Sequence, residues 1–240
     1  MFPFERELIE RKIADAHKVI ENALTKMKNP YVAWSGGKDS TIVVHLVIQH
    51  KPDIAIVHLD ADADFPETLQ YIERLKREWK LNLITVKTKS LLELVARYGY
   101  SDELTRIVMK AVVYEPIKRL IKQNGFDGCF LGVRSDESYG RSKLLRAQGK
   151  LFFNKTYGIW QCLPIGWWSV DDVMRYYEYT NIPLHPLYRE NLFEPIEQRR
   201  VSYFAGGTSK ERGRFVSVKF YHRSLYNEMR KRTRWVSFFS

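Results

Sequence analysis

The chain has 240 residues, of which 45% are hydrophobic and 28% charged, a balance typical of a globular domain and unlike that of a disordered or fibrous chain. No apolar run approaches the roughly 18 residues that a membrane-spanning helix requires. The first residues are charged where a secretory signal would be apolar. The sequence therefore argues against a membrane-spanning helix, and we expect a cytoplasmic protein with no membrane partner.

The formal net charge of +11 is unevenly distributed along the chain. Eleven basic and two acidic residues lie between Arg199 and Ser240, so the rest of the chain is nearly neutral. We therefore predict two regions, a domain at 1–190 and a basic, aromatic extension at 191–240. Excess positive charge of this kind indicates an anionic partner.

Cysteine usage limits the redox and metal chemistry. Cys129 and Cys162 are the two cysteines of the sequence, too few for a disulfide framework, and no CxxC pair is present to hold zinc. Both lie in or beside apolar stretches. We predict two buried thiols, with neither a zinc ion nor an iron–sulfur cluster.

Hydrophobic periodicity predicts alternating helices and strands. Apolar residues at spacings of three and four indicate an amphipathic N-terminal helix over 4–27. Apolar runs typical of buried strands occupy 30–34, 53–59, 81–86, 128–132 and 159–165. Helical patterns occupy 41–49, 66–79, 91–98, 102–123 and 169–180. This alternation predicts a doubly wound, Rossmann-like α/β fold, with a parallel sheet of about five strands and helices on both faces.

Three segments have less regular patterns. The polar stretch at 133–158 reads as a long ordered loop over an active site. Ser169 is a plausible N-cap for the helix that follows it, because its hydroxyl can accept a hydrogen bond from a first-turn amide. Acidic residues in the first turn also favour a helix start. Within the extension, helical patterns occur near 194–204 and 219–231.

The strongest motif is SGGKDS at 35–40, between a predicted strand and a predicted helix. Glycines let backbone amides approach an anion, and the helix adds the positive end of its dipole. Lys38 supplies a point charge and the two serines supply hydroxyl donors. The spacing differs from the Walker loop, so hydrolysis of a γ-phosphate is not expected. We predict a phosphate-binding loop made by Ser35, Gly36, Gly37, Lys38, Asp39 and Ser40.

Four segments together resemble a known family. SGGKDS resembles the PP-loop of the adenine-nucleotide α-hydrolase-like superfamily. The stretches HLDADADFPET at 58–68, LGVRSDESYGR at 131–141 and the tryptophan- and proline-rich segment at 163–188 are similar, in the same order, to segments of phosphoadenosine phosphosulfate (PAPS) reductases and of the small subunit of ATP sulfurylase. This resemblance implies an adenine nucleotide as ligand, either ATP with Mg²⁺ or PAPS or adenylyl sulfate.

The resemblance also suggests roles for individual residues. Arg134 and Arg141 would contact phosphate or sulfate oxygens, because guanidinium forks suit such anions, with Glu137 orienting one of them and Ser138 beside them. Asp60 would hydrogen-bond the nucleoside at the end of the second strand. We predict Lys38, Arg134 and Arg141 as the catalytic residues.

Other polar residues of these segments have two interpretations. Asp39, Asp62 and Asp64 either reach Mg²⁺ through water or stabilise the start of a helix. His58 and the 183–188 turn are more typical of core packing than of ligand contact.

The chain departs from the reductases in one respect. Those enzymes carry a nucleophilic cysteine in an ECG-x-H tail, and no cysteine follows Cys162 here. The corresponding region is basic and glycine-rich. Its cations would form a lid over the nucleotide, a nucleic-acid arm, or a solvated basic face, and the residues concerned are Lys210, Arg212 and Arg214.

These observations favour an enzyme that adenylates an acceptor and releases pyrophosphate. The acceptor is sulfate or a nucleic-acid group. One alternative is a reductase-like protein that binds PAPS or adenylyl sulfate and takes its thiol from a partner protein. Another is a nucleotide-dependent subunit that binds nucleic acid.

Overall fold

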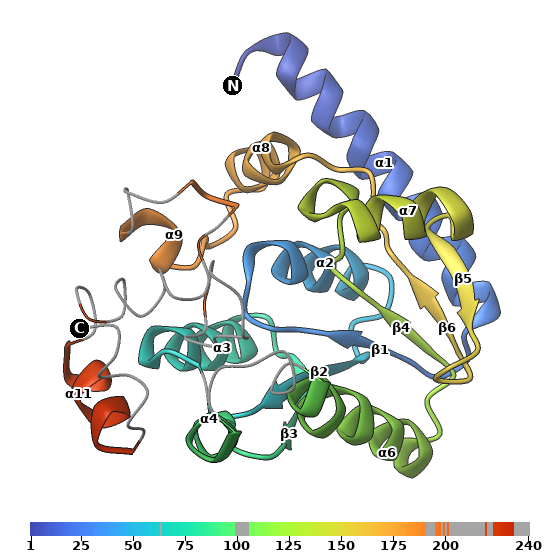
Figure 1. Cartoon of the computed structure of the whole chain (residues 1–240). Helices are drawn as coiled ribbons and strands as arrows, with labels where there is room; N and C mark the ends of the chain where they lie inside the picture. Colours follow the sequence, from blue (N-terminus) through green and yellow to red (C-terminus); the bar gives the residue numbers. More distant parts are fainter. Residues whose placement is uncertain are drawn as a thin grey trace.

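The computed structural model describes residues 1–62, 64–98, 106–190, 195–197, 199, 201, 219 and 223–232. Its centre is a six-stranded sheet in the order β3-β2-β1-β4-β6-β5 (Figure 1). The strands are β1 (Pro30–Ala33), β2 (Ala55–Asp60), β3 (Asn82–Lys87), β4 (Gly128–Phe130), β5 (Leu151–Asn154) and β6 (Ile159–Cys162). All neighbouring pairs are parallel except β5 with β6. The doubly wound α/β fold is confirmed.

Helices surround the sheet. They are α1 (Pro3–Lys26), α2 (Lys38–Ile48), α3 (Pro66–Glu78), α4 (Leu91–Tyr98), the π-helix η1 (Met109–Tyr114), α6 (Glu115–Asn124), the 3₁₀ turn η2 (Ser135–Glu137), α7 (Tyr139–Gln148), α8 (Val170–Thr180), α9 (Leu187–Glu190) and α11 (Arg223–Arg232). None of the helices in the described residues is long and apolar enough to cross a membrane.

Two hydrophobic clusters cover opposite faces of the sheet. On β1, Val32 belongs to the larger cluster with residues of α1, α2, α3 and α8, whereas its neighbour Tyr31 belongs to a smaller cluster with Leu120 of α6. The same alternation places Ile56 and Val57 of β2 in different clusters, as expected of successive residues in a strand. The sheet is therefore covered by helices on both sides, as Figure 1 shows.

The prediction of a loop over 133–158 is wrong. This stretch contains η2, α7 and the edge strand β5, which pairs antiparallel with β6. Helix α7 buries only Leu145 among its ten residues, so it lacks the apolar stripe that reveals an amphipathic helix. Strand β5 has four residues at the edge of the sheet, too few for a clear alternating pattern.

Other local predictions are confirmed. Helix α1 buries Ile9, Ala16, Ile20 and Ala23, the apolar stripe of the sequence. Ser169 caps α8, because its Oγ accepts a hydrogen bond of 3.2 Å from the amide of Asp172. In the basic extension, α11 occupies most of the segment predicted as a helix and contacts α4. The predicted helix at 194–204 falls largely outside the described residues, and the domain boundary near residue 190 stays a prediction.

Candidate functional site

The glycine loop joins β1 to α2 and is held by its own side chains. Gly36 has φ of +73°, a left-handed conformation that favours glycine, and Gly37 is the N-cap of α2. Ser40 Oγ donates to the Gly37 carbonyl at 3.0 Å and accepts from the Ser35 amide at 3.3 Å. The two serine hydroxyls lie 3.1 Å apart. The loop is therefore fixed before any ligand arrives.

Several backbone donors remain available at this end of α2. The amides of Gly36, Asp39 and Ser40 have no hydrogen-bond acceptor among the described residues, whereas the Lys38 amide donates to Tyr188 Oη at 3.3 Å. These amides lie at the positive end of the helix dipole. They form the kind of donor set that binds phosphate groups.

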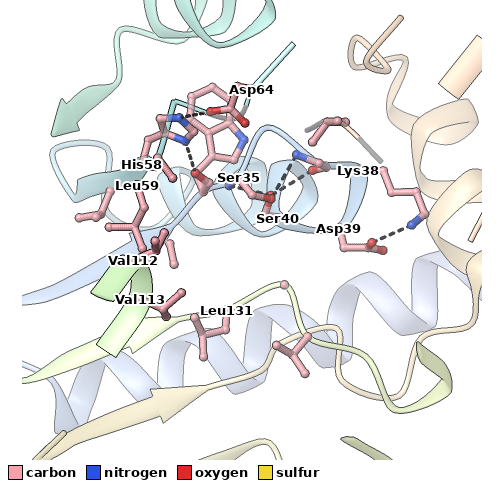
Figure 2. Close-up of a pocket in the computed structure, with 18 of the residues that line it drawn as sticks. Ser35, Lys38, Asp39, Ser40, His58, Leu59, Asp64, Val112, Val113 and Leu131 are labelled. Atoms are coloured by element: carbon pink, nitrogen blue, oxygen red, sulfur yellow. Dashed lines mark hydrogen bonds and ion pairs between the residues drawn. The ribbon is translucent and has the colours of Figure 1, made fainter. Parts of the chain in front are cut away.

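A cavity of about 540 Å³ lies at the carboxyl ends of β1, β2 and β4. The glycine loop forms one part of its wall, and apolar side chains of β2, η1 and the end of β4 form another (Figure 2). The apolar part includes Leu59, Met109, Val112, Val113 and Leu131. A crevice at this edge, where β1 has β2 on one side and β4 on the other, is the usual ligand site of open α/β sheets.

Gly132 lets the two parts of the site approach each other. A Cβ atom at this position would lie 2.6 Å from the backbone nitrogen of Ser40. Only a glycine therefore allows the chain after β4 to meet the start of α2. The sequence predicted no role for this glycine, although it stands within the arginine-containing motif at 131–141.

Lys38 and Arg134 share one carboxylate. One carboxylate oxygen of Asp39 accepts a 2.8 Å hydrogen bond from Lys38 Nζ, and the other accepts a 2.7 Å hydrogen bond from Arg134 Nε. Arg134 also donates to Asp136 at 2.5 Å and to the Trp168 carbonyl at 3.2 Å. Burial opposes its charge, but the neighbouring carboxylates raise the pKa of Arg134 above its ordinary value. With 1% of its surface exposed, Arg134 lies behind Asp39 and not in the cavity wall.

Arg141 does line the cavity, together with Glu137. The Arg141 guanidinium pairs with Glu137, whose Oε2 also accepts a 2.9 Å hydrogen bond from the Arg134 amide. Ser138 caps α7 by accepting from the Arg141 amide at 3.3 Å and is not in the wall. The motif therefore separates its two arginines, one inside the protein and one at the cavity.

The aspartates after β2 have different surroundings. Asp60 pairs with Lys87 at 2.5 Å; partial burial opposes its charge, but this contact holds the pKa of Asp60 below its usual value. Asp62 accepts a hydrogen bond from Ser90, and neither it nor Asp60 lines the cavity.

The described residues contain no group of three or more acidic, histidine or cysteine side chains that could hold a metal. This does not test a water-mediated contact of Asp39, Asp62 or Asp64 with Mg²⁺, which needs only one or two carboxylates and stays a prediction. Asp39 already pairs with two cations, and Asp64 pairs with His58.

His58 was expected in the core and is buried, but it also lines the cavity. Its Nδ1 lies 3.0 Å from the Trp34 carbonyl and its Nε2 lies 3.0 Å from Asp64 Oδ2 (Figure 2). Burial lowers the pKa of His58, but these two acceptors outweigh burial, so the pKa is raised. Through these two contacts, His58 links Asp64, in the loop after β2, to Trp34, which precedes the glycine loop.

Both cysteines are buried, as predicted. Burial raises the pKa of Cys129 to about 12 and raises that of Cys162 as well. Neither thiol lines the cavity.

The chain after α9 returns to the glycine loop. Thr68 donates its hydroxyl hydrogen to the Val201 carbonyl, and Arg199 donates to the Tyr188 carbonyl. Val201 lines the cavity. Lys210, Arg212 and Arg214, the predicted lid cations, lie outside the described residues.

Comparison with known proteins agrees with the motifs. The PAPS reductase of Vibrio campbellii is 28% identical over 217 residues, which cover 88% of this chain and 82% of the relative. A PAPS reductase from Candida auris, solved as a phosphate complex, matches with a TM-score of 0.59 and 19% identity, over 76% of this chain and 90% of that chain. An FMN adenylyltransferase from Candida glabrata, solved with ATP, matches with a TM-score of 0.57 and 14% identity, over 76% of this chain and 59% of that chain.

The two structural matches share the fold. The family assignment comes from the sequence, because the profile of the phosphoadenosine phosphosulfate reductase domain matches residues 29–225. The resemblance predicted from four motifs is thereby confirmed, and the chain belongs to the PAPS reductase domain family.

Proposed function

We propose that this chain is an enzyme that binds ATP or a related adenine nucleotide in the 540 Å³ cavity and transfers the adenylyl group to an acceptor. One observation carries the proposal: residues of the glycine loop and an apolar wall line the same cavity. An anion and a flat base are the two parts of a nucleotide that such a cavity accommodates. The family and the ATP complex of the adenylyltransferase from Candida glabrata support it.

The reaction requires no protein nucleophile. An acceptor oxygen attacks the α-phosphorus, and the bond between that phosphorus and the pyrophosphate oxygen breaks. The amides of Gly36, Asp39 and Ser40, with Lys38 and Arg141, would stabilise charge on the departing pyrophosphate. Arg134 would act indirectly, because it holds the Asp39 carboxylate that pairs with Lys38.

The named relatives favour a second candidate, a protein that binds PAPS. Reduction of PAPS needs a thiolate as nucleophile. Cys129 and Cys162 have raised pKa values and lie away from the cavity wall. This candidate therefore needs a thiol from a partner protein, and for that reason we rank it second.

The acceptor is either sulfate or a group on a nucleic acid. The second option has support from α11, which contacts α4 and exposes Arg223, Arg230 and Lys231. Helix α4 contributes Leu91 to the cavity wall and exposes Arg97. A polyanion bound along these helices would lie close to the cavity.

Ligand-induced stabilisation tests the proposal, because a ligand that binds only the folded state raises the melting temperature. We expect ATP to stabilise the protein and Lys38→Met to abolish that shift. Lys155→Met, in the exposed turn between β5 and β6, is the matched control and should keep it. Pyrophosphate release in the presence of sulfate or nucleic acid then identifies the acceptor.

Stabilisation by PAPS without any effect of ATP would contradict adenylyl transfer and favour the second candidate. Absence of a shift with ATP, PAPS and adenylyl sulfate would contradict nucleotide binding altogether.

A further inference from the structure

Tyr188 of α9 lies against the start of α2. Its Oη accepts a 3.3 Å hydrogen bond from the Lys38 amide, and Lys38 Nζ lies 5.4 Å from the centre of its ring. A Cβ atom added to Gly37 would lie 3.5 Å from the same hydroxyl. Tyr188 is 6% exposed and lines the cavity with Ser35 and Ser40. Its hydroxyl is therefore next to the amides that the proposed function assigns to pyrophosphate.

The position of this side chain is fixed by its own turn. The Tyr188 amide donates to the His185 carbonyl at 3.1 Å, and the two rings meet nearly edge to face, with centroids 6.1 Å apart. His185 is in turn fully buried, with its Nε2 3.0 Å from Thr68 Oγ1. A phenol held in this way is pre-organised and loses little freedom when a ligand binds.

A second tyrosine offers an internal comparison. Tyr177 of α8 donates its hydroxyl hydrogen to the Lys38 carbonyl at 2.9 Å. The two tyrosines therefore bracket the backbone of Lys38, one at its amide and the other at its carbonyl. Tyr188 faces the cavity with the glycine loop, whereas Tyr177 does not line it.

We infer that Tyr188 is a ligand-contacting residue, whose hydroxyl donates a hydrogen bond to a phosphate oxygen held by the glycine loop. This inference rests on the proposed function. A phenol is both a donor and an acceptor, and its oxygen here already accepts from the Lys38 amide. A phosphate oxyanion only accepts hydrogen bonds, so the Tyr188 hydroxyl would be the donor to it. Such charge-assisted hydrogen bonds are stronger than neutral ones.

Calorimetric titration of the full chain with inorganic pyrophosphate tests this contact. Tyr188→Phe keeps the ring and removes the hydroxyl, so we expect about a tenfold loss of pyrophosphate affinity, the effect of one hydrogen bond to a charged group. Tyr177→Phe removes a hydroxyl that donates to the Lys38 carbonyl and does not line the cavity. This variant should leave the pyrophosphate affinity unchanged. The melting temperature of each ligand-free variant reports on folding.

Unchanged affinity in Tyr188→Phe overturns the inference, as does an equal loss in Tyr177→Phe, because an equal loss would mean that both variants act through the backbone of Lys38. If Tyr188→Phe melts well below the unchanged protein, Tyr188→His provides the second test. It keeps a ring N–H donor and should bind pyrophosphate more tightly than Tyr188→Phe; equal affinities overturn the inference. If the protein without substitutions binds neither pyrophosphate nor ATP, the proposed function is wrong, and this inference is wrong with it.

Discussion

The two sides of the cavity are built in different ways. The anion side consists of consecutive residues, 35–40, whose conformation follows from a strand, two glycines and a helix start. The opposite side brings together η1, the end of β4 and the segment around Arg141, which are far apart in the sequence. Local rules suffice for the first side, whereas the second depends on how the sheet and helices pack. Substitutions on the two sides should therefore have different effects.

The two arginines of one motif give the largest contrast. Arg134 is buried and pairs with Asp39 and Asp136, so Arg134→Met removes one of the two cations of Asp39 and the cation paired with Asp136. We expect it to lower the free energy of unfolding by about 3 kcal/mol, the effect of breaking a buried ion pair. Arg141→Met removes a side chain that is 42% exposed, and it should change stability by less than about 0.5 kcal/mol while weakening ATP binding.

Denaturant unfolding and ATP titration of both variants measure this difference. Equal stability losses in the two variants would show that the structure assigns the arginines to the wrong environments.

A glycine pair tests the contact between the two sides. Gly132→Ala places a methyl group 2.6 Å from the Ser40 nitrogen, and backbone atoms cannot yield as a flexible side chain would. We expect a loss of about 2 kcal/mol in the free energy of unfolding, with weaker ATP binding because the start of α2 shifts. The measurement is denaturant unfolding followed by ATP titration.

Gly140→Ala is the matched control, because a Cβ at Gly140 meets no atom within 4 Å. This glycine lies in the first turn of α7, so alanine should be neutral or slightly stabilising. A stability loss in Gly140→Ala equal to that in Gly132→Ala would argue against the close approach at Gly132.

The sequence predicted those parts of the molecule that depend on neighbouring residues. The glycine loop, the cap at Ser169 and the stripe of α1 are local patterns, and each is found in the structure. Alternation of strands and helices also predicted the parallel sheet, because parallel strands need crossover connections.

Contacts between distant residues were not predictable in the same way. An arginine in a motif gives no sign of whether it faces a ligand or, as Arg134 does, two carboxylates. His58 pairs with Asp64 across a loop, and Tyr188 reaches the start of α2 from a separate segment. Both side chains were expected in the core, which describes their burial but misses their place in the cavity wall.

The last effect concerns the pH dependence of the turn that carries Tyr188. Burial lowers the pKa of His185 to about 4, so the unfolded chain binds a proton more readily than the folded protein does. Its contribution to stability is complete above the unfolded pKa of about 6.5 and is lost as the pH falls toward 4. Between pH 7 and 5 we expect a decrease of about 2 kcal/mol in the free energy of unfolding from this residue, an upper bound that partial solvation reduces.

His185→Gln isolates this contribution, because glutamine does not titrate and still offers a hydrogen bond to Thr68. The variant should be less stable at pH 7, but the difference from the unchanged protein should shrink as the pH falls to 5. Burial also lowers the pKa of His17 and His45, and the variant leaves their effects in place. A stability difference that is constant between pH 7 and 5 would mean that His185 does not titrate differently in the folded protein. The hydrogen bonds of the turn would then be equally stable at both pH values, and Tyr188 would keep its position at the glycine loop throughout this pH range.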